Sequence, residues 1–426
     1  MLHAQYPTVR ELLLEGNFGL EKEGLRVTPE GYFAHTPHPF PGDDHIVRDF
    51  CENQTEINTP VLASAHDVVE ALARYTRQIQ QTLYALPKRE YLWPFSNPPF
   101  IRNEDDIPVA QFAGGRASKT TYRQYLSDRY GRYKMTFSGI HFNYSFSDAL
   151  LRADFAASGE ENFVAYKNQL YVDLAKRVAA YGWILTAVTA ASPLLDSSFV
   201  EKGRFGEDAF NGMASTRCSE LGYWNFFAPI FDYSDIRAYA DSMQNYVEEG
   251  LLAFPTELYY PVRLKPAGRN SLTALREQGV NHIELRMFDL NPLAPAGVDE
   301  RDVVFAQLLL VWLASTPAEP FPMRAQVHAV QNFKNAAHYD LKTVKIMQPG
   351  REILSVADAG LEVLESMQEF YRAFPTQVQS VLKFEKGKFL DPENRYAWKI
   401  RRQFAGGFVE KGLELARQQQ EEAIHV

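Results

Sequence analysis

Cysteine is scarce in this chain of 426 residues: only Cys51 and Cys218 occur, and they form no CxxC pair. This scarcity argues against a disulfide scaffold and a cysteine-rich zinc site, and it fits a reducing cytoplasm. Long apolar runs are also missing. The most apolar stretch, Val303–Ala314, is about a dozen residues, whereas a membrane span needs roughly 20, so we expect a buried helix there. The N-terminal residues lack the pattern of a signal peptide, so we expect a cytoplasmic protein with no membrane partner.

An excess of positive charge is absent as well, because the formal net charge is -9 at pH 7. Nucleic-acid binding depends on clustered cations that neutralise phosphates, so we expect no nucleic-acid partner. The net charge does not exclude the binding of anionic small substrates, since a metal ion can reverse the sign of the charge in a site. We also find no recognisable serine or cysteine nucleophile motif, which argues against catalysis through a covalent enzyme intermediate.

Apolar periodicity divides the chain into helical and extended segments. The predicted helices are Ala65–Ala85, Asn162–Ala190, Ser234–Glu249 (with Ser234 as N-cap), Asp299–Ala314, Met323–His338, Ala357–Ala373 and Val409–Ile424. Residues 97–99 and 104–108 are predicted to be exposed loops. The best strand candidates, Lys134–Phe146 and His282–Leu290, are polar on one face and apolar on the other, a pattern typical of antiparallel sheets. We therefore predict an α+β fold.

The polar faces of these two strands carry residues that can do chemistry. His282, Glu284 and Arg286 share one face of the later strand, and His141 and Asn143 share one face of the earlier strand. A solvated outer face with an internal Glu–Arg pair and a structural histidine would explain the same pattern. The residues alone leave both interpretations open.

Acidic residues near the N-terminus add to this set. If residues 18–27 form a strand, Glu21 and Glu23 lie on one face, where like charges repel unless a cation lies between them. Asp49 and Glu56 follow in the sequence. Carboxylates suit a hard divalent cation such as Mg²⁺, while one histidine shifts the preference slightly toward Mn²⁺ or zinc. The pattern predicts a magnesium site, with a wet surface strand as the alternative.

Several segments in order resemble one family, the bacterial glutamate–cysteine ligases that share their fold with glutamine synthetase. The resemblance runs from about residue 15 to 300 and rests on GLEKEGLRV (19–27), DFCENQTEINTP (49–60), WPFS (93–96), DIPVAQ (106–111), Tyr122–Arg123, SGIHFNYS (138–145), RCSELGYWN (217–225), YYPVR (259–263) and IELRMFDLNPLAPAGV (283–298). It implies a curved, mainly antiparallel sheet that forms an open half-barrel surrounded by helices. It also implies a single catalytic domain over 1–426, whose C-terminal third, from about 300, is mostly helical support.

The resemblance implies roles by position. The metal ligands would be Glu21, Glu23, Asp49, Glu56, His141 and Glu284. Arg286 would meet the transferring phosphate, and Arg217 would recognise the glutamate or phosphate end. The remaining substrate-binding positions would be Tyr122, Arg123, Asn143, Tyr223, Tyr259 and Arg263, with the three tyrosines forming the wall of a cysteine pocket. One departure is Pro108, which stands where the family often carries an acid, so that Glu104, Asp105 or a water would have to replace one metal ligand.

The implied reaction joins the γ-carboxylate of glutamate to the amine of cysteine, with ATP as co-substrate and Mg²⁺ or Mn²⁺ as cofactor. It proceeds through a γ-glutamyl phosphate and is the first step of glutathione synthesis. The length leaves no room for the ATP-grasp domain of bifunctional relatives, so we do not expect the second step here. Three alternatives remain: a γ-glutamyl ligase with a different amino acid or amine acceptor, a metallohydrolase, and a non-catalytic sensor of glutamate or nucleotide.

Overall fold

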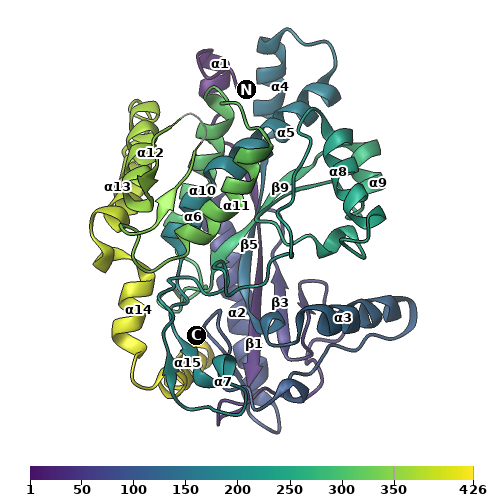
Figure 1. Ribbon diagram of the computed structural model, residues 1–426, viewed down its shortest axis with the longest axis vertical. Coiled ribbons are helices and arrows are strands. Elements are labelled where there is room, and N and C mark those ends of the chain that lie inside the picture. The colour runs from purple at the N-terminus through teal and green to yellow at the C-terminus, as the bar shows by residue number, and fades with distance from the viewer. Residues whose placement is uncertain (349–350, 426) are drawn as a thin grey trace.

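The computed structural model describes residues 1–348 and 351–425, and a seven-stranded sheet runs through its centre (Figure 1). The strand order is β2-β3-β1-β5-β9-β8, with β4 paired to β1, and every pairing is antiparallel. The strands are β1 (Gly16–Val27), β2 (Ile46–Arg48), β3 (Gln54–Asn58), β4 (Tyr91–Leu92), β5 (Gly139–Phe146), β8 (Val262–Lys265) and β9 (His282–Asp289). The two edge strands, β2 and β8, do not pair with each other, so the sheet is open. The predicted α+β class with an open, mainly antiparallel sheet is confirmed.

Helices surround the sheet. They are α1 (Pro7–Arg10), α2 (Ala65–Ala85), α3 (Ala117–Tyr130), α4 (Asp148–Ser158), α5 (Phe163–Tyr181), α6 (Trp183–Thr189), α7 (Ser197–Val200), α8 (Ile236–Glu248), α9 (Leu272–Gln278), α10 (Glu300–Ser315), α11 (Met323–Ala336), α12 (Val356–Phe370), α13 (Thr376–Leu390), α14 (Tyr396–Phe404) and α15 (Phe408–His425). Two small two-stranded sheets complete the fold: β6 (Leu195–Asp196) with β7 (Asp208–Ala209), and β10 (Lys345–Ile346) with β11 (Leu354–Ser355). Figure 1 shows α3 standing out from the body.

The main core lies on one face of the sheet. Alternate residues of β1 and β5, among them Leu20, Phe142 and Tyr144, are buried, and so are Ile283 and Leu285 of β9. Helices α2 and α5 contact this sheet, and α10 packs on both helices. Because successive side chains of a strand point to opposite faces, burying these residues turns the polar set toward the other face. The core therefore fixes the orientation of the site.

Three predicted boundaries are wrong for identifiable reasons, and the ends of the other predicted helices lie within three residues of the observed ones. The predicted helix 162–190 is interrupted at Gly182, a residue with low helix propensity, and forms α5 and α6. Helix α8 is capped by Asp235 rather than Ser234, because the Asp235 carboxylate accepts from the backbone N–H groups of Arg237 and Ala238. Strand β5 begins at Gly139, since residues 134–136 form a 3₁₀ turn.

The loop at residues 97–99 is buried, which corrects the prediction of an exposed loop. The Asn97 side-chain amide donates to the backbone carbonyls of Ser192 (3.0 Å) and Leu194 (2.7 Å), and the backbone carbonyl of Asn97 accepts from the Trp93 indole at 2.7 Å. These hydrogen bonds satisfy polar groups that burial would otherwise leave unpaired. Residues 104–108 include a short 3₁₀ helix and are partly exposed.

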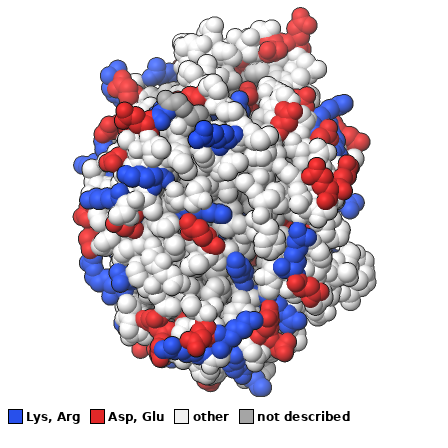
Figure 2. Space-filling view, viewed as in Figure 1, with Lys and Arg blue, Asp and Glu red and all other residues white. Residues whose placement is uncertain are grey.

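A second apolar core joins the sheet to the C-terminal helices. Trp93 and Phe95, just after β4, pack edge-on against Phe408 of α15, and Phe95 also packs against Phe404 of α14. Basic and acidic side chains are interspersed over the face shown in Figure 2. Within residues 1–348 and 351–425, none of the helices combines the length and apolarity that crossing a bilayer requires.

Candidate active site

The strand register gathers the predicted polar residues on one face of the sheet. Glu23 of β1 lies opposite Glu56 of β3, and Glu21 of β1 lies opposite His141 of β5. In the next pair of strands, Asn143 of β5 lies opposite Glu284 of β9. Glu284 in turn lies opposite Arg263 of the edge strand β8. Cross-strand partners have Cβ atoms about 5 Å apart, so neighbouring strands build one continuous polar surface.

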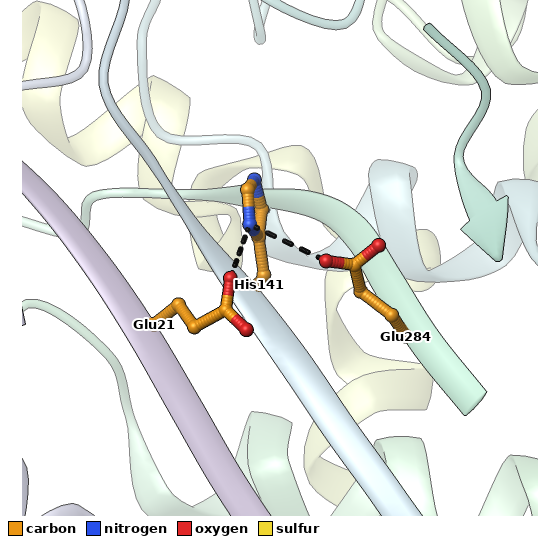
Figure 3. Close-up of side chains that lie close together, drawn as sticks. All are labelled: Glu21, His141 and Glu284. Atoms are coloured by element: carbon orange, nitrogen blue, oxygen red, sulfur yellow. Dashed lines mark hydrogen bonds and ion pairs between the residues drawn. The ribbon is translucent and has the colours of Figure 1, made fainter. Parts of the chain in front are cut away.

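Glu21, His141 and Glu284 form the most compact part of this surface (Figure 3). Their ligand atoms all lie within 4.8 Å of one another, and no other set of three acids, histidines or cysteines within residues 1–348 and 351–425 does so. The imidazole Nδ1 of His141 lies 3.0 Å from Glu21 Oε2 and 3.8 Å from Glu284 Oε1. The Asn143 amide donates to Glu21 Oε1 at 2.9 Å, which fixes that carboxylate.

Two cations accompany Glu284. Its Oε1 lies 3.0 Å from the Arg286 guanidinium and 3.2 Å from Lys265 Nζ. Burial alone would raise the pKa of Glu284, but the charges of Arg286 and Lys265 outweigh it and hold the pKa well below the usual range. Burial and the charge of Arg286 lower the pKa of His141, which favours a neutral imidazole that is free to act as a ligand.

Glu23, Glu56 and Asp49 form the more acidic part of the surface. Burial and the charge of Asp49 raise the pKa of Glu23 to about 8, although the backbone N–H of Gly139 donates to it at 2.9 Å. Burial, together with the charges of Asp49, Glu21 and Glu23, raises the pKa of Glu56 well above its usual value. Neighbouring carboxylates with raised pKa values are the expected signature of a site that takes up cations.

The donor set fits Mg²⁺. Oxygen donors dominate, and two buried oxygens, Glu284 Oε2 and Asn143 Oδ1, have no hydrogen-bond partner among the described residues. Unpaired buried oxygens are costly unless something satisfies them, and a hard divalent cation satisfies carboxylates well. Glu21, His141 and Glu284 would hold one such ion, while Glu23, Asp49 and Glu56 border it less tightly.

A cavity of about 480 Å³ opens beside Arg286. It is lined by Arg217, Tyr223, Tyr259 and Arg286, and further by Thr186, Cys218, Trp224, Tyr260, Pro261, Met287 and Phe333. The rings of Tyr223 and Tyr259 pack edge to face, with centroids 4.6 Å apart. Tyr122 does not line this cavity and instead packs edge-on against Phe254. Two of the three predicted wall tyrosines therefore face one cavity with two of the four predicted arginines, Arg217 and Arg286.

A second cavity, of about 600 Å³, lies at the other end of the cluster. Glu21 and Asn143 line it, and amide groups dominate its polar wall, which also includes Asn17, Asn58, Asn281 and His282. The Glu21–His141–Glu284 cluster therefore has a cavity on either side, one entered past Arg286 and one past Glu21.

The guanidinium groups of Arg123 and Arg263 donate hydrogen bonds to backbone carbonyls. Arg123 Nε donates to the Asp49 carbonyl at 2.6 Å, and its guanidinium lies over the Phe112 ring. Arg263 donates to the carbonyls of Thr256 and Leu258. These contacts make Arg123 a support for Asp49 and place Arg263 at the edge of the polar surface.

Lys265 was not predicted to take part in the site, whereas Pro108, Glu104 and Asp105 were considered for it. Lys265 pairs with Glu284, and its signal was present in the sequence, because it alternates with Arg263 along β8. Pro108 supplies only its backbone carbonyl, which accepts from the Glu52 N–H at 2.7 Å. Glu104 pairs with Lys202 at 3.1 Å, and Asp105 has a side chain that is 98% exposed, so both candidate replacements for the missing acid are oriented elsewhere.

Comparison with known proteins matches these features to one family. The family model described as glutamate-cysteine ligase matches residues 3–336. The glutathione biosynthesis bifunctional protein GshAB of Listeria welshimeri is 36% identical over 432 residues, which cover 97% of this chain and 55% of that protein. The chain thus spans about half the length of the curated relatives it matches.

Two solved structures share the architecture. The glutamate–cysteine ligase of Francisella tularensis, in complex with AMP, superposes with a TM-score of 0.85 at 23% identity, covering 96% of this chain and 89% of that one. The bifunctional glutathione synthetase of Pasteurella multocida superposes with a TM-score of 0.84 at 28% identity, covering 98% of this chain and 54% of that one. With the family model matching most of the chain, this protein belongs to the glutamate-cysteine ligase family.

Proposed function

We propose that this chain ligates the γ-carboxylate of glutamate to the amine of cysteine, using ATP and Mg²⁺. The observation that carries the proposal is the acidic and imidazole cluster with one cavity on each side. A ligase of this kind must bring a nucleotide and an amine to the same carboxylate from two directions. The AMP bound by the Francisella neighbour supports ATP as the nucleotide.

Positioning and charge neutralisation would drive the reaction. A carboxylate is a poor electrophile, so the glutamate oxygen first attacks the γ-phosphorus of ATP and ADP leaves. The amine of the acceptor then attacks the resulting acyl phosphate and expels phosphate. Arg286 and Arg217 line the same cavity and would offset the charge of the phosphoryl and carboxylate oxygens. This scheme needs no enzyme nucleophile.

Glu21, His141 and Glu284 would hold Mg²⁺, which would supply positive charge that offsets the charge of the triphosphate. The amide-rich cavity beside Glu21 and Asn143 is where we place the nucleotide. The cavity beside Arg286 is where we place the acceptor, with Arg217 in its lining.

The acceptor cavity favours a small uncharged side chain. Its walls are aromatic or apolar apart from the two arginines, Thr186 and the Cys218 thiol. Burial raises the pKa of that thiol to about 11, which keeps it neutral. Cysteine fits these walls, and so would alanine or 2-aminobutyrate. A different acceptor is therefore the alternative that the test must separate.

The test is a product assay by mass spectrometry, with glutamate, ATP and Mg²⁺ supplied to a panel of acceptors. We expect γ-glutamylcysteine and equimolar ADP and phosphate, with cysteine giving the highest kcat/KM among cysteine, alanine, 2-aminobutyrate and simple amines. A higher kcat/KM for another amine would replace cysteine in the assignment. Cleavage of a peptide without ATP would instead favour a metallohydrolase, and binding without turnover would favour a sensor.

We also propose that the chain acts as one catalytic unit, with the helices beyond about residue 300 as its support. This proposal draws on the two apolar cores, which both combine residues of the sheet with residues of the C-terminal helices.

A further inference from the structure

The guanidinium of Arg217 is held against the sheet in an unusual way. Arg217 lies outside the sheet, yet its side chain is 8% exposed and reaches the end of β9. It donates to the backbone carbonyls of Arg286, at 3.0 Å from both terminal nitrogens, and of Phe288. Its Nε has no hydrogen-bond partner among the described residues and faces the carboxylate of Asp289 at 3.7 Å.

Gly139 provides the space in which this guanidinium lies. A Cβ built on Gly139 would stand 2.3 Å from one terminal nitrogen of Arg217, 2.4 Å from Cζ and 2.6 Å from Nε. All three nearest atoms belong to this one side chain. Gly139 is also the direct strand partner of Asp289, so the guanidinium sits over the last residue pair of β5 and β9.

Asp289 is itself fixed from several directions. Its carboxylate accepts from the backbone N–H of Ala191 at 2.9 Å, the Ser192 hydroxyl at 2.7 Å and the Ser215 hydroxyl at 3.0 Å. It is 2% exposed. A carboxylate held by this many donors presents a fixed negative charge, and that charge faces the Nε side of Arg217.

We propose that Gly139 and Asp289 are positioning residues for Arg217: the glycine supplies the space for the guanidinium and the aspartate sets its orientation toward the reacting carboxylate or phosphate. The proposal rests on the role of Arg217 in the proposed function. Without these two residues Arg217 keeps its charge, but its guanidinium is no longer held in the same position. Since orientation of reacting groups accounts for a large part of such a barrier, a shift of about 1 Å can cost about 10²-fold in rate.

The glycine is needed for the arginine rather than for the backbone. Gly139 is absent from the glycines with positive φ, so alanine can adopt its conformation. The atoms that an alanine methyl would meet are the far end of a flexible side chain, which can move aside. The backbone N–H that donates to Glu23 remains in an alanine variant. Gly139→Ala should therefore fold and lose activity, with a loss of stability limited to the hydrogen bonds that the displaced guanidinium gives up.

A double-mutant cycle tests the glycine. We expect Gly139→Ala to lower kcat/KM by about 10²-fold while lowering the melting temperature no further than Arg217→Ala does, because both variants give up the same guanidinium contacts. Arg217→Ala should lower kcat/KM at least as far, and the double variant should equal Arg217→Ala within about twofold, since the glycine then has nothing to position. Gly387→Ala, in α13, is the matched control, because its added Cβ meets nothing closer than 3.8 Å, and it should keep full activity.

The outcomes separate the two proposals. Full activity in Arg217→Ala would remove Arg217 from the proposed function, whatever Gly139 does. Loss of activity in Arg217→Ala combined with a further tenfold loss in the double variant would show that Gly139 acts through another group, and would overturn the positioning role. Full activity in Gly139→Ala would overturn it as well.

Asp289→Asn extends the test to the charge. The asparagine amide has only one acceptor oxygen, so it cannot accept from Ala191, Ser192 and Ser215 as the carboxylate does. We therefore expect a lower stability both in the parent protein and in the Arg217→Ala variant. Activity should respond differently: kcat/KM should fall by about tenfold where Arg217 is present and stay level where it is absent. An equal loss of kcat/KM in both backgrounds would assign Asp289 a structural role only.

Discussion

Individual residues of the site were predictable where strand alternation governs them. Glu21 and Glu284 sit on the polar faces that the alternating pattern indicated, and the register brings both to His141. Arg217 is different, because it reaches the site from a segment outside the sheet. Its partner Asp289 and the space above Gly139 lie 72 and 78 positions away from it in the sequence, respectively, and no local pattern encodes such contacts.

Glu284→Gln isolates one of these residues. The change keeps size but removes the charge that pairs with Arg286 and Lys265 and that would bind the cation. We expect kcat/KM for ATP-dependent product formation to fall by about 10³-fold, with a higher Mg²⁺ requirement. Glu300→Gln is the control, since that carboxylate is exposed and, among the described residues, pairs only with His66. Activity within about tenfold of the parent protein would remove Glu284 from the catalytic site.

At the scale of elements, the β-bulge between β5 and β9 has the largest consequence for the site. Ile140 pairs with Phe288 and Phe142 with Leu285, so His141 alone faces both Arg286 and Met287. The simple alternation that separated Arg286 from Met287 therefore fails at this point, and both side chains line the acceptor cavity. Periodicity predicted helices α2, α5, α8, α10, α11, α12 and α15 but not α3 or α13, and a bulge leaves no period to detect.

Helices α10 and α13 meet at a buried charged cluster, from which we expect a pH-dependent stability. Lys388 Nζ lies 2.7 Å from Asp302 and 2.8 Å from Glu385, and the Tyr396 hydroxyl donates to Asp302. Burial raises the pKa of Glu385 well above its usual value, and that of Asp302 also rises. A raised folded-state pKa means that the folded protein binds a proton that the unfolded chain releases.

The direction in which stability changes with pH follows from these raised pKa values. The stability that this proton supplies is complete below the unfolded pKa, near 4.3, and is lost as the pH rises toward the folded pKa of Glu385. We expect Glu385→Gln to remove that share of the pH dependence. Urea unfolding at pH 5.5 and pH 8 measures it: the loss of unfolding free energy between the two should be smaller in Glu385→Gln than in the parent protein. Equal losses would contradict the assignment.

At the scale of the whole molecule, the sheet and the C-terminal helices depend on each other. The second core is built from β4, the segment after it, α14 and α15, which are more than 300 residues apart in the sequence. Periodicity predicted α15 as an amphipathic helix but could not identify the surface it packs on. Its partners on the sheet side include Trp93 and Phe95, which the family resemblance noted only as a motif.

Phe408→Ala tests whether these parts unfold together. Phe408 is 1% exposed and contacts the rings of Trp93 and Phe95, so its truncation should cost about 3–5 kcal/mol of unfolding free energy. Leu390→Ala, at a position that is 61% exposed, should cost far less. In both variants, tryptophan fluorescence, far-ultraviolet circular dichroism and loss of activity should follow one denaturation curve, because the C-terminal helices share a core with the sheet that carries the site. If the helices melted first while activity persisted, the chain would comprise two independent units, and the site would not need its C-terminal support.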